Sequence, residues 1–228
     1  MGFTVVYDVT GSNFGHQPAG NVALYVTGSQ GVPATAAQLA KHPEAVLIDQ
    51  TPASGQWDNK ADVDDYERGA VRLDELAGRA KARISSFNSA ARPGQRSPAV
   101  YASASNISDV VNNLIKGGVK SGVGLWVANW SLSEPTAISE VINASGPFPI
   151  IGVQFHNAGL FDISVFSTTW LNNRSAVHKP VKAVPPPGPW LDANEWDWRE
   201  VSTIGVGMDG REHTFTYNRA NNAWNKLQ

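Results

Sequence analysis

The sequence predicts an α/β protein, a degenerate (β/α)8 TIM-like barrel followed by a small C-terminal β appendage. Short apolar runs alternate with helical segments along residues 3–171, which is typical of a parallel sheet. Several of these runs are continuously apolar or β-branched, as expected for strands covered on both faces. Eight strand candidates suit a closed barrel better than an open sheet.

The strands are expected at Phe3–Val9, Val22–Thr27, Ala45–Asp49, Val63–Tyr66, Ala99–Ala102, Gly124–Asn129, Ile150–Phe155 and, more weakly, Asp162–Phe166. Helices are expected at Ala34–Lys41, Gly69–Ala91, Ser108–Lys116 and Glu134–Ala144. Ser133 is a plausible N-cap for the last of these, with Pro135 in its first turn. The first and last connections between strands are too short to hold a helix.

Residues 62–67 carry four acids in six positions. Read as a strand, this run places Asp65 and Glu67 on one face, and Asp62 and Asp64 on the other. Carboxylates two residues apart on a strand have Cα atoms roughly 6–7 Å apart, so both can reach one glycosidic bond. One would serve as acid and the other as base, nucleophile or charge stabiliser. The alternative is a solvated acidic turn at the N-terminus of the next helix.

Other polar residues stand at expected strand ends: Asp8, Asp49, Asn129 and Gln154. In β/α barrels this rim is where catalytic groups gather, because its loops form the substrate cleft. An aspartate after a strand is also a common turn former or helix cap. The rim further carries the aromatic residues Tyr25, Tyr101, Trp126, Trp130 and Phe155. Such rings suit the apolar faces of sugars, or they belong to the core.

Composition narrows the class of protein. The net charge is −2 over 228 residues without a basic stripe or helix, so neither a nucleic-acid nor a membrane partner is expected. Cysteine is absent, which excludes disulfides and thiol catalysis. His16 and His156 have no second ligand at helical spacing, so no metal site is expected. No signal peptide or membrane-spanning run is visible, which predicts a soluble protein delivered by another route.

The order of these landmarks resembles glycoside hydrolase family 25, the Chalaropsis-type lysozymes, particularly the actinobacterial and phage members. The resemblance covers about residues 3 to 171. It rests on the segments Tyr7-Asp8-Val9, Asp65-Tyr66-Glu67, Trp126-Val127-Ala128-Asn129-Trp130, Gln154-Phe155 and Phe161-Asp162-Ile163-Ser164-Val165-Phe166.

The resemblance implies hydrolysis of the β-1,4 bond between N-acetylmuramic acid and N-acetylglucosamine in peptidoglycan. Glu67 would be the general acid, and Asp65 would stabilise developing positive charge or orient the substrate's acetamido group. Asp8 and Asp162 would line the cleft floor and raise the pKa of Glu67 by like-charge proximity. No cofactor or metal is implied.

The sequence also departs from the family. The segment Ile48-Asp49-Gln50-Thr51-Pro52 stands where the family usually places aromatic and histidine residues. Asp49 would either line the cleft or cap a turn. Asp64 adds a charge that the catalytic pair does not require, and we expect it to face solvent.

The C-terminal part of the chain has a different composition. Residues 172–189 form a Pro-rich linker, and residues 190–228 hold four of the eight tryptophans. Within this module, residues 201–217 predict a strand, an Asp-Gly turn and a second strand, resembling one blade of a tectonin-type β-propeller. Such a unit is suited to glycan binding or to attachment.

Two functions fit these observations. The first is a phage-encoded peptidoglycan hydrolase that acts at the bacterial wall after release at lysis. The second is a phage tail or virion protein whose barrel binds wall glycan with weak or no turnover, and whose residues 190–228 contact other virion proteins. The low share of charged residues, 17%, is typical of assembly contacts.

Overall fold

The computed structural model describes residues 2–27, 32–50, 61–66, 73–90 and 94–175, and the backbone of three strands between residues 202 and 226. The chain divides into two compact units, residues 1–177 and 178–228. Glu67, Pro52 and most of the Pro-rich and Trp-rich segments lie outside the described residues.

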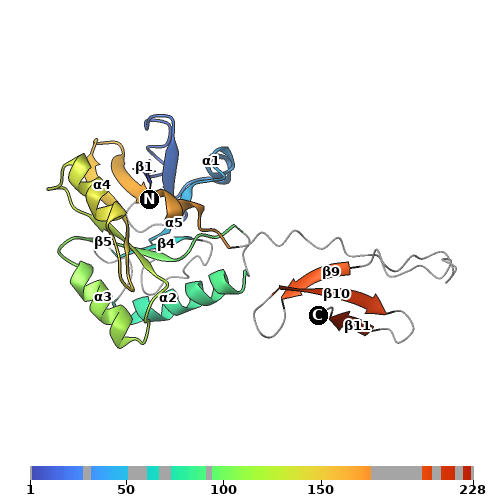
Figure 1. The fold of residues 1–228 in the computed structure, drawn as a ribbon. Coiled ribbons are helices and arrows are strands. Elements are labelled where there is room, and N and C mark those ends of the chain that lie inside the picture. Colours follow the sequence, from blue (N-terminus) through green and yellow to red (C-terminus); the bar gives the residue numbers. More distant parts are fainter. Residues whose placement is uncertain are drawn as a thin grey trace. The chain divides into compact units, whose positions relative to one another are not determined.

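The first unit contains a closed barrel of eight strands that neighbour one another in chain order (Figure 1). They are β1 (Phe3–Val9), β2 (Asn21–Tyr25), β3 (Val46–Asp49), β4 (Val63–Asp65), β5 (Ala99–Ser103), β6 (Gly124–Ala128), β7 (Ile150–Asn157) and β8 (Asp162–Ser167). Strands β1 to β7 are parallel, whereas β8 runs antiparallel to both β7 and β1. The link from β7 to β8 is too short for a crossover, so the chain can only return in the opposite direction.

Helices cover part of the outside of the barrel. They are α1 (Ala36–Lys41), α2 (Leu73–Asn88), α3 (Ile107–Lys116), α4 (Glu134–Ile142) and α5 (Thr168–Asn172). The expected helices are found, and α2 and α3 pack side by side while α4 packs on β7 and β8. Strict alternation of strand and helix is not shown, because β1 and β2, like β7 and β8, are joined without a helix.

Alternation along the strands separates an inner core from outer layers. Inside the barrel, Trp126 packs edge-on against Tyr101 with ring centroids 4.8 Å apart, and the Phe166 ring centroid lies 4.9 Å from that of Trp126. Gly152 on β7 gives Phe166 its space, since a Cβ at this position would lie 2.7 Å from the Phe166 ring. Outside, the core between α2, α3 and the sheet is apolar and includes Leu76, Ala80, Val100, Leu114 and Val127.

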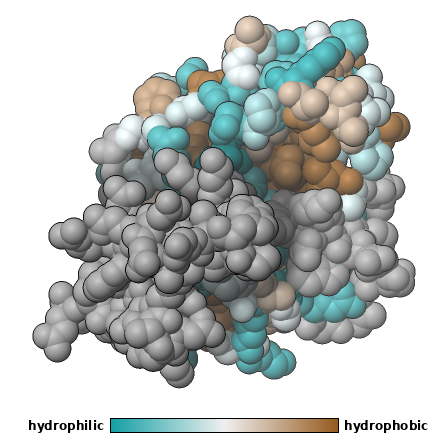
Figure 2. Space-filling model, turned by 90° about the vertical axis from the view of Figure 1, so that its right-hand side faces the viewer, coloured by the Kyte–Doolittle hydropathy of each residue, from teal (hydrophilic) through white to brown (hydrophobic). Residues whose placement is uncertain are grey.

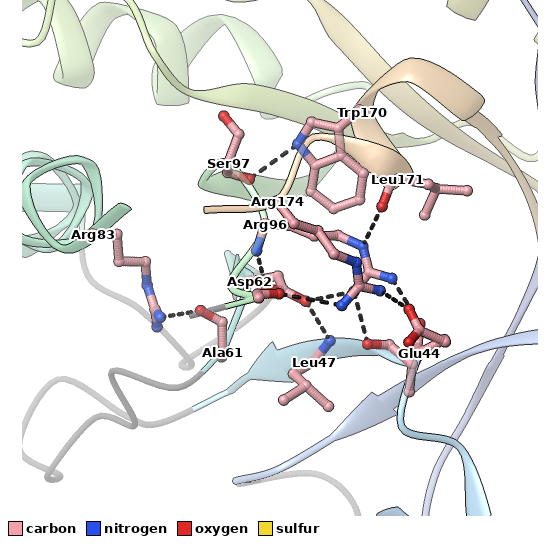
Figure 3. A network of polar contacts seen from close by, with 12 residues as sticks. Glu44, Leu47, Ala61, Asp62, Arg83, Arg96, Ser97, Trp170, Leu171 and Arg174 are labelled. Carbon is pink, nitrogen blue, oxygen red and sulfur yellow. Dashed lines mark hydrogen bonds and ion pairs between the residues drawn. The ribbon is translucent and has the colours of Figure 1, made fainter. Parts of the chain in front are cut away.

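Arg96 links several segments of the chain at the end of the barrel where β1 to β7 begin (Figure 3). Its guanidinium donates to Asp62 at 2.9 Å, to the Leu171 carbonyl at 3.1 Å and to the Ala45 carbonyl at 2.8 Å. It also lies over the Trp170 ring, 5.9 Å from its centroid. Asp62 is thus a buried structural carboxylate that connects β3, β4 and β5 at this end.

Residues 172–175, expected in the linker, pack on the barrel. Asn172 ends α5, and the Ser175 amide donates to the Gln95 carbonyl at 2.7 Å. Arg174 forms an ion pair with Glu44, which is also visible in Figure 3. The barrel therefore continues a few residues beyond the predicted end of the domain.

The second unit contains a three-stranded antiparallel sheet in the order β11-β10-β9. Its strands are β9 (Ser202–Val206), β10 (Glu212–Asn218) and β11 (Ala223–Lys226). The pairing of β9 with β10 confirms the hairpin expected from the sequence, and β11 adds a strand that was not predicted.

The surface of the described part is mixed in polarity. Figure 2 shows hydrophilic side chains beside a group of hydrophobic ones on one face. Among the side chains that the structure describes, five large apolar ones are exposed: Phe3, Val32, Ile115, Trp130 and Leu160. None of the helices in the described ranges combines the length and apolar character needed to cross a membrane.

A candidate active site at one rim of the barrel

The C-terminal ends of β1 to β7 and the start of β8 form one rim, called here the carboxyl rim. Because β8 is antiparallel, Asp162 at its beginning lies opposite Asp8 near the end of β1, and the two are paired in register. The structure therefore brings together two acids that are 154 positions apart in the chain. Asp8 is buried and Asp162 is partly exposed.

Gln154 on β7 connects these two acids. Its side chain is fully buried, and its Nε2 donates to Asp8 Oδ2 at 3.1 Å and to Asp162 Oδ2 at 3.3 Å. The Tyr101 hydroxyl donates to Gln154 Oε1 at 2.6 Å, and the Tyr25 hydroxyl donates to Asp8 Oδ2 at 3.3 Å. One amide nitrogen thus lies within hydrogen-bond distance of both carboxylates and can donate one hydrogen to each.

Asp65 lies on the same inner face, beside Tyr101 in register, and is fully buried. Its Oδ2 accepts a hydrogen bond of 2.8 Å from Nε2 of Gln50, the residue that follows β3. Every strand, or the residue after it, then adds a polar side chain to the inner face. In strand order these are Asp8, Tyr25, Gln50, Asp65, Tyr101, Trp126, Gln154 and Asp162.

Glu67, the expected general acid, lies outside the described residues, so its distance from Asp65 is not given by the structure. Val63 packs inside the barrel and Asp62 and Asp64 bind arginines, which agrees with the alternation predicted for this strand. The alternation directs Asp65 inward toward the other candidate acids.

Asp64 does not face solvent as expected, since only 1% of its side chain is exposed. Arg83 of α2 binds both of its oxygens, from Nε at 2.8 Å and from Nη2 at 2.7 Å. Arg79, one helical turn earlier, lies 3.8 Å from Asp64 Oδ1. The acid is buried because helix α2 brings two guanidinium groups against the outer face of β4.

Asp49 shares that outer face, since it is in register with Asp64 on the neighbouring strand. It is fully buried, with Arg83 Nη2 3.2 Å from Oδ2 and the Thr27 hydroxyl donating to Oδ1 at 2.6 Å. Asp49 therefore faces helix α2 and not the inner face of the barrel. Gln50, the next residue, occupies the inner position.

The buried arginines Arg83 and Arg96 differ in how far nearby carboxylates offset the cost of burying their charge. Burial lowers the pKa of Arg83, but Asp64, Asp49 and Asp62 together outweigh it, so its pKa is raised above the ordinary value. Burial also lowers the pKa of Arg96, and here Asp62 does not compensate fully, so the pKa falls. Arginine nevertheless stays charged at any ordinary pH.

The aromatic and amide residues expected to bind substrate fall into two groups. Trp126 has no exposed surface and its Nε1 donates to Ser164 Oγ at 3.2 Å, so it belongs to the core together with Tyr101. Trp130 is 49% exposed at the carboxyl end of β6. Asn129 beside it accepts hydrogen bonds from the amide and hydroxyl of Ser131, which shapes the turn.

Sequence reasoning missed Gln50, Arg79 and Arg83. The two arginines stand four residues apart in a predicted helix directly after an acidic run, and this spacing places both on one helix face. That pattern could have revealed the outer ion-pair network. No comparable signal distinguishes Gln50, whose role depends on the register between β3 and β4.

Two cavities of the described part lie elsewhere, although Asn129 at the carboxyl end of β6 contributes to the lining of the first. One of about 850 Å³ opens between α3 and α4 and is lined by Ile107, Val127 and Phe148 among others. The other, of about 380 Å³, lies at the opposite end of the barrel near Trp170 and Ser97. Neither is lined by any of the three inward carboxylates.

In the described ranges, no group of three or more acidic or histidine side chains is arranged to hold a metal ion. Comparisons with family models, curated proteins and solved structures give no match to this chain.

Proposed function

We propose that the chain is a glycoside hydrolase that cleaves the β-1,4 bond between N-acetylmuramic acid and N-acetylglucosamine in peptidoglycan. The observation that carries this proposal is the set of three carboxylates, from β1, β4 and β8, directed to the inside of a closed barrel at its carboxyl rim. That rim is the usual place of catalysis in β/α barrels, and paired carboxylates are the usual catalysts of glycosidases. The barrel would be a degenerate (β/α)8 barrel of the family-25 type.

In this proposal Glu67 protonates the glycosidic oxygen as the bond to the leaving sugar breaks, and water then adds to the anomeric carbon and returns a proton to Glu67. Asp65 remains ionised and stabilises positive charge at the anomeric carbon, directly or by orienting the substrate's acetamido group. Gln50 supplies a hydrogen bond to the ionised form of Asp65. Asp8 and Asp162, joined by Gln154, form the floor of the cleft and keep negative potential near Glu67. No cofactor enters this mechanism.

Trp130 offers an exposed aromatic face at the same rim, suited to the apolar face of a sugar ring. We further propose that the protein is phage-encoded and acts at the bacterial wall, with residues 190–228 binding wall polymer or another virion protein.

The test is release of reducing sugar from purified actinobacterial peptidoglycan by the full chain and by Glu67→Gln. Loss of a general acid is expected to reduce the rate by about 10²-fold or more. Glu140→Gln on α4, which lines the cavity between α3 and α4, is the matched control and should retain full activity.

If neither the intact chain nor Glu67→Gln releases sugar while both sediment with the wall, the hydrolase proposal is wrong. The barrel is then a glycan-binding part of a virion protein. Retention of full activity by Glu67→Gln would also contradict the assigned acid.

A further inference from the structure

We infer that Gln50 is a positioning residue that holds the Asp65 carboxylate in one orientation and in its ionised form. The expected effect on catalysis rests on the proposed glycosidase activity. The expected effect on the titration of Asp65 rests only on the contact between the two side chains. Nothing in the acidic sequence run points to Gln50, which lies 15 residues before Asp65.

The contact is buried on both sides. Gln50 is 3% exposed, Asp65 is fully buried, and Nε2 lies 2.8 Å from Oδ2. A hydrogen bond to a carboxylate away from water is charge-assisted and stronger than a neutral one. Because the amide donates to the charged form, it opposes the tendency of burial to neutralise the acid.

Gln50 is itself fixed by the outer ion-pair network. Its backbone amide donates to Thr27 Oγ1 at 3.0 Å, and the same hydroxyl donates to Asp49 Oδ1 at 2.6 Å. Asp49 is in turn bound by Arg83 at 3.2 Å. This chain of contacts runs from α2 through β3 to the inner face, so the donor of Asp65 is placed by the same arginine that neutralises Asp49.

The neighbouring carboxylates cannot replace the Gln50 amide, because an ionised carboxylate does not donate a hydrogen bond to Asp65. On the inner face, Tyr101 lies beside it in register, and Asp8 and Asp162 lie beyond Gln154. The two acids disfavour a further negative charge. Asp49 and Asp64 lie on the outer face, where Arg83 binds both of them. A neutral amide at position 50 therefore adds a donor without adding another carboxylate to the inner face.

The experiment compares the full-length wild type with Gln50→Leu and with Gln95→Leu. Gln95 is also 3% exposed and pairs with Ser86, and it lies at the other end of the barrel, before β5, so it controls for loss of a buried amide. Aspartate side-chain carboxyls are labelled with ¹³C, the Asp65 signal is identified by its absence in Asp65→Asn, and its titration is followed by NMR. We expect the pKa of Asp65 to rise in Gln50→Leu and to stay unchanged in Gln95→Leu.

The catalytic readout is the pH–rate profile on peptidoglycan. In Gln50→Leu, kcat should fall by at least about tenfold and the acid limb should move to higher pH, because a charge-assisted hydrogen bond is lost. If the titration moves as expected but the wild type does not cleave the wall, the proposed function fails and the role of Gln50 stands.

An unchanged Asp65 titration in a folded Gln50→Leu protein would overturn the inference. Should Gln50→Leu not fold, Gln50→Glu preserves the side-chain volume and replaces the donor by a second carboxyl. It is then expected to raise the pKa of Asp65 by like-charge repulsion, and an unchanged titration in this variant would overturn the inference as well.

Discussion

Replacing Arg83 by methionine tests whether the outer ion-pair network stabilises the barrel. Methionine retains much of the apolar stem of arginine and removes only the guanidinium. In the native protein that group is 1% exposed and binds both oxygens of Asp64, one oxygen of Asp49 and the Ala61 carbonyl. Its removal leaves two buried carboxylates on adjacent strands without their shared cation.

The expected loss of unfolding free energy follows from the contacts that Arg83 makes. Breaking a buried ion pair by removing one partner costs about 3–5 kcal/mol. Arg79 remains 3.8 Å from Asp64 and offsets part of the loss, so we expect about 3 kcal/mol. With an m-value of about 1–3 kcal/mol per molar urea, the unfolding midpoint of the barrel should fall by about 1–3 M.

The assay is urea unfolding of the full chain, with Arg174→Met as the control. Arg174 is 26% exposed and its partner Glu44 is 75% exposed, so this pair should contribute less than about 1 kcal/mol. Equal losses in the two variants would refute the reasoning. Adding Asp64→Asn and Asp49→Asn to Arg83→Met should recover more than half of the loss, since the uncompensated charges are then removed.

The raised pKa of Arg83 also predicts how the loss of stability in Arg83→Met depends on pH. Burial opposes the charge on Arg83, but the surrounding carboxylates raise its pKa above the ordinary value. A raised pKa means that the stabilisation is complete below the unfolded pKa and is lost only as pH rises through the folded one. Both values lie far above neutrality, so the loss in Arg83→Met should be the same at pH 7 and at pH 9.

Two further substitutions test packing and hydrogen bonding. Gly152→Ala should lower the free energy of unfolding by about 1–3 kcal/mol, because the new Cβ would lie 2.7 Å from the Phe166 ring. In Gly78→Ala on α2, the new Cβ meets nothing within 4 Å, so the free energy of unfolding should rise by up to about 1 kcal/mol. A loss of stability in both variants would contradict the steric explanation. Tyr101→Phe removes the buried donor to Gln154 Oε1 and should cost about 1–3 kcal/mol by urea unfolding, so an unchanged midpoint would show that this hydrogen bond does not stabilise the barrel.

The positions of the barrel elements were predictable because hydrophobic periodicity is a local property. The first strand was predicted with its observed bounds, Phe3–Val9, and α3 differs from its prediction by one residue. The reversed direction of β8 is set by the short connection before it rather than by its own residues. That direction decides whether Asp162 lies at the same rim as Asp8 or at the opposite one.

The candidate site was predictable only in part. Asp8, Asp65 and Gln154 follow from strand ends and alternation, which are visible in the sequence. The burial of Asp64 and Asp49 depends on Arg83, whose contacts with them span 19 and 34 residues of sequence. The spacing of Arg79 and Arg83 indicates a basic helix face, but which carboxylates that face meets depends on how α2 packs on the sheet.

The antiparallel closing strand has a consequence for the order in which the barrel folds. Gln50 and Asp65 are 15 residues apart, whereas Asp8 and Gln154 are 146 apart, and Thr4 and Thr168, which join β1 to the start of α5, are 164 apart. Contacts of long sequence separation carry the larger loop-closure cost and form slowly. The half of the rim around Asp65 can therefore form in a partly folded chain, while the half around Asp8 exists only after β8 has inserted between β7 and β1. A nascent chain that has not yet produced β8 would hold an incomplete rim, and its first and seventh strands would present unpaired edges to other chains.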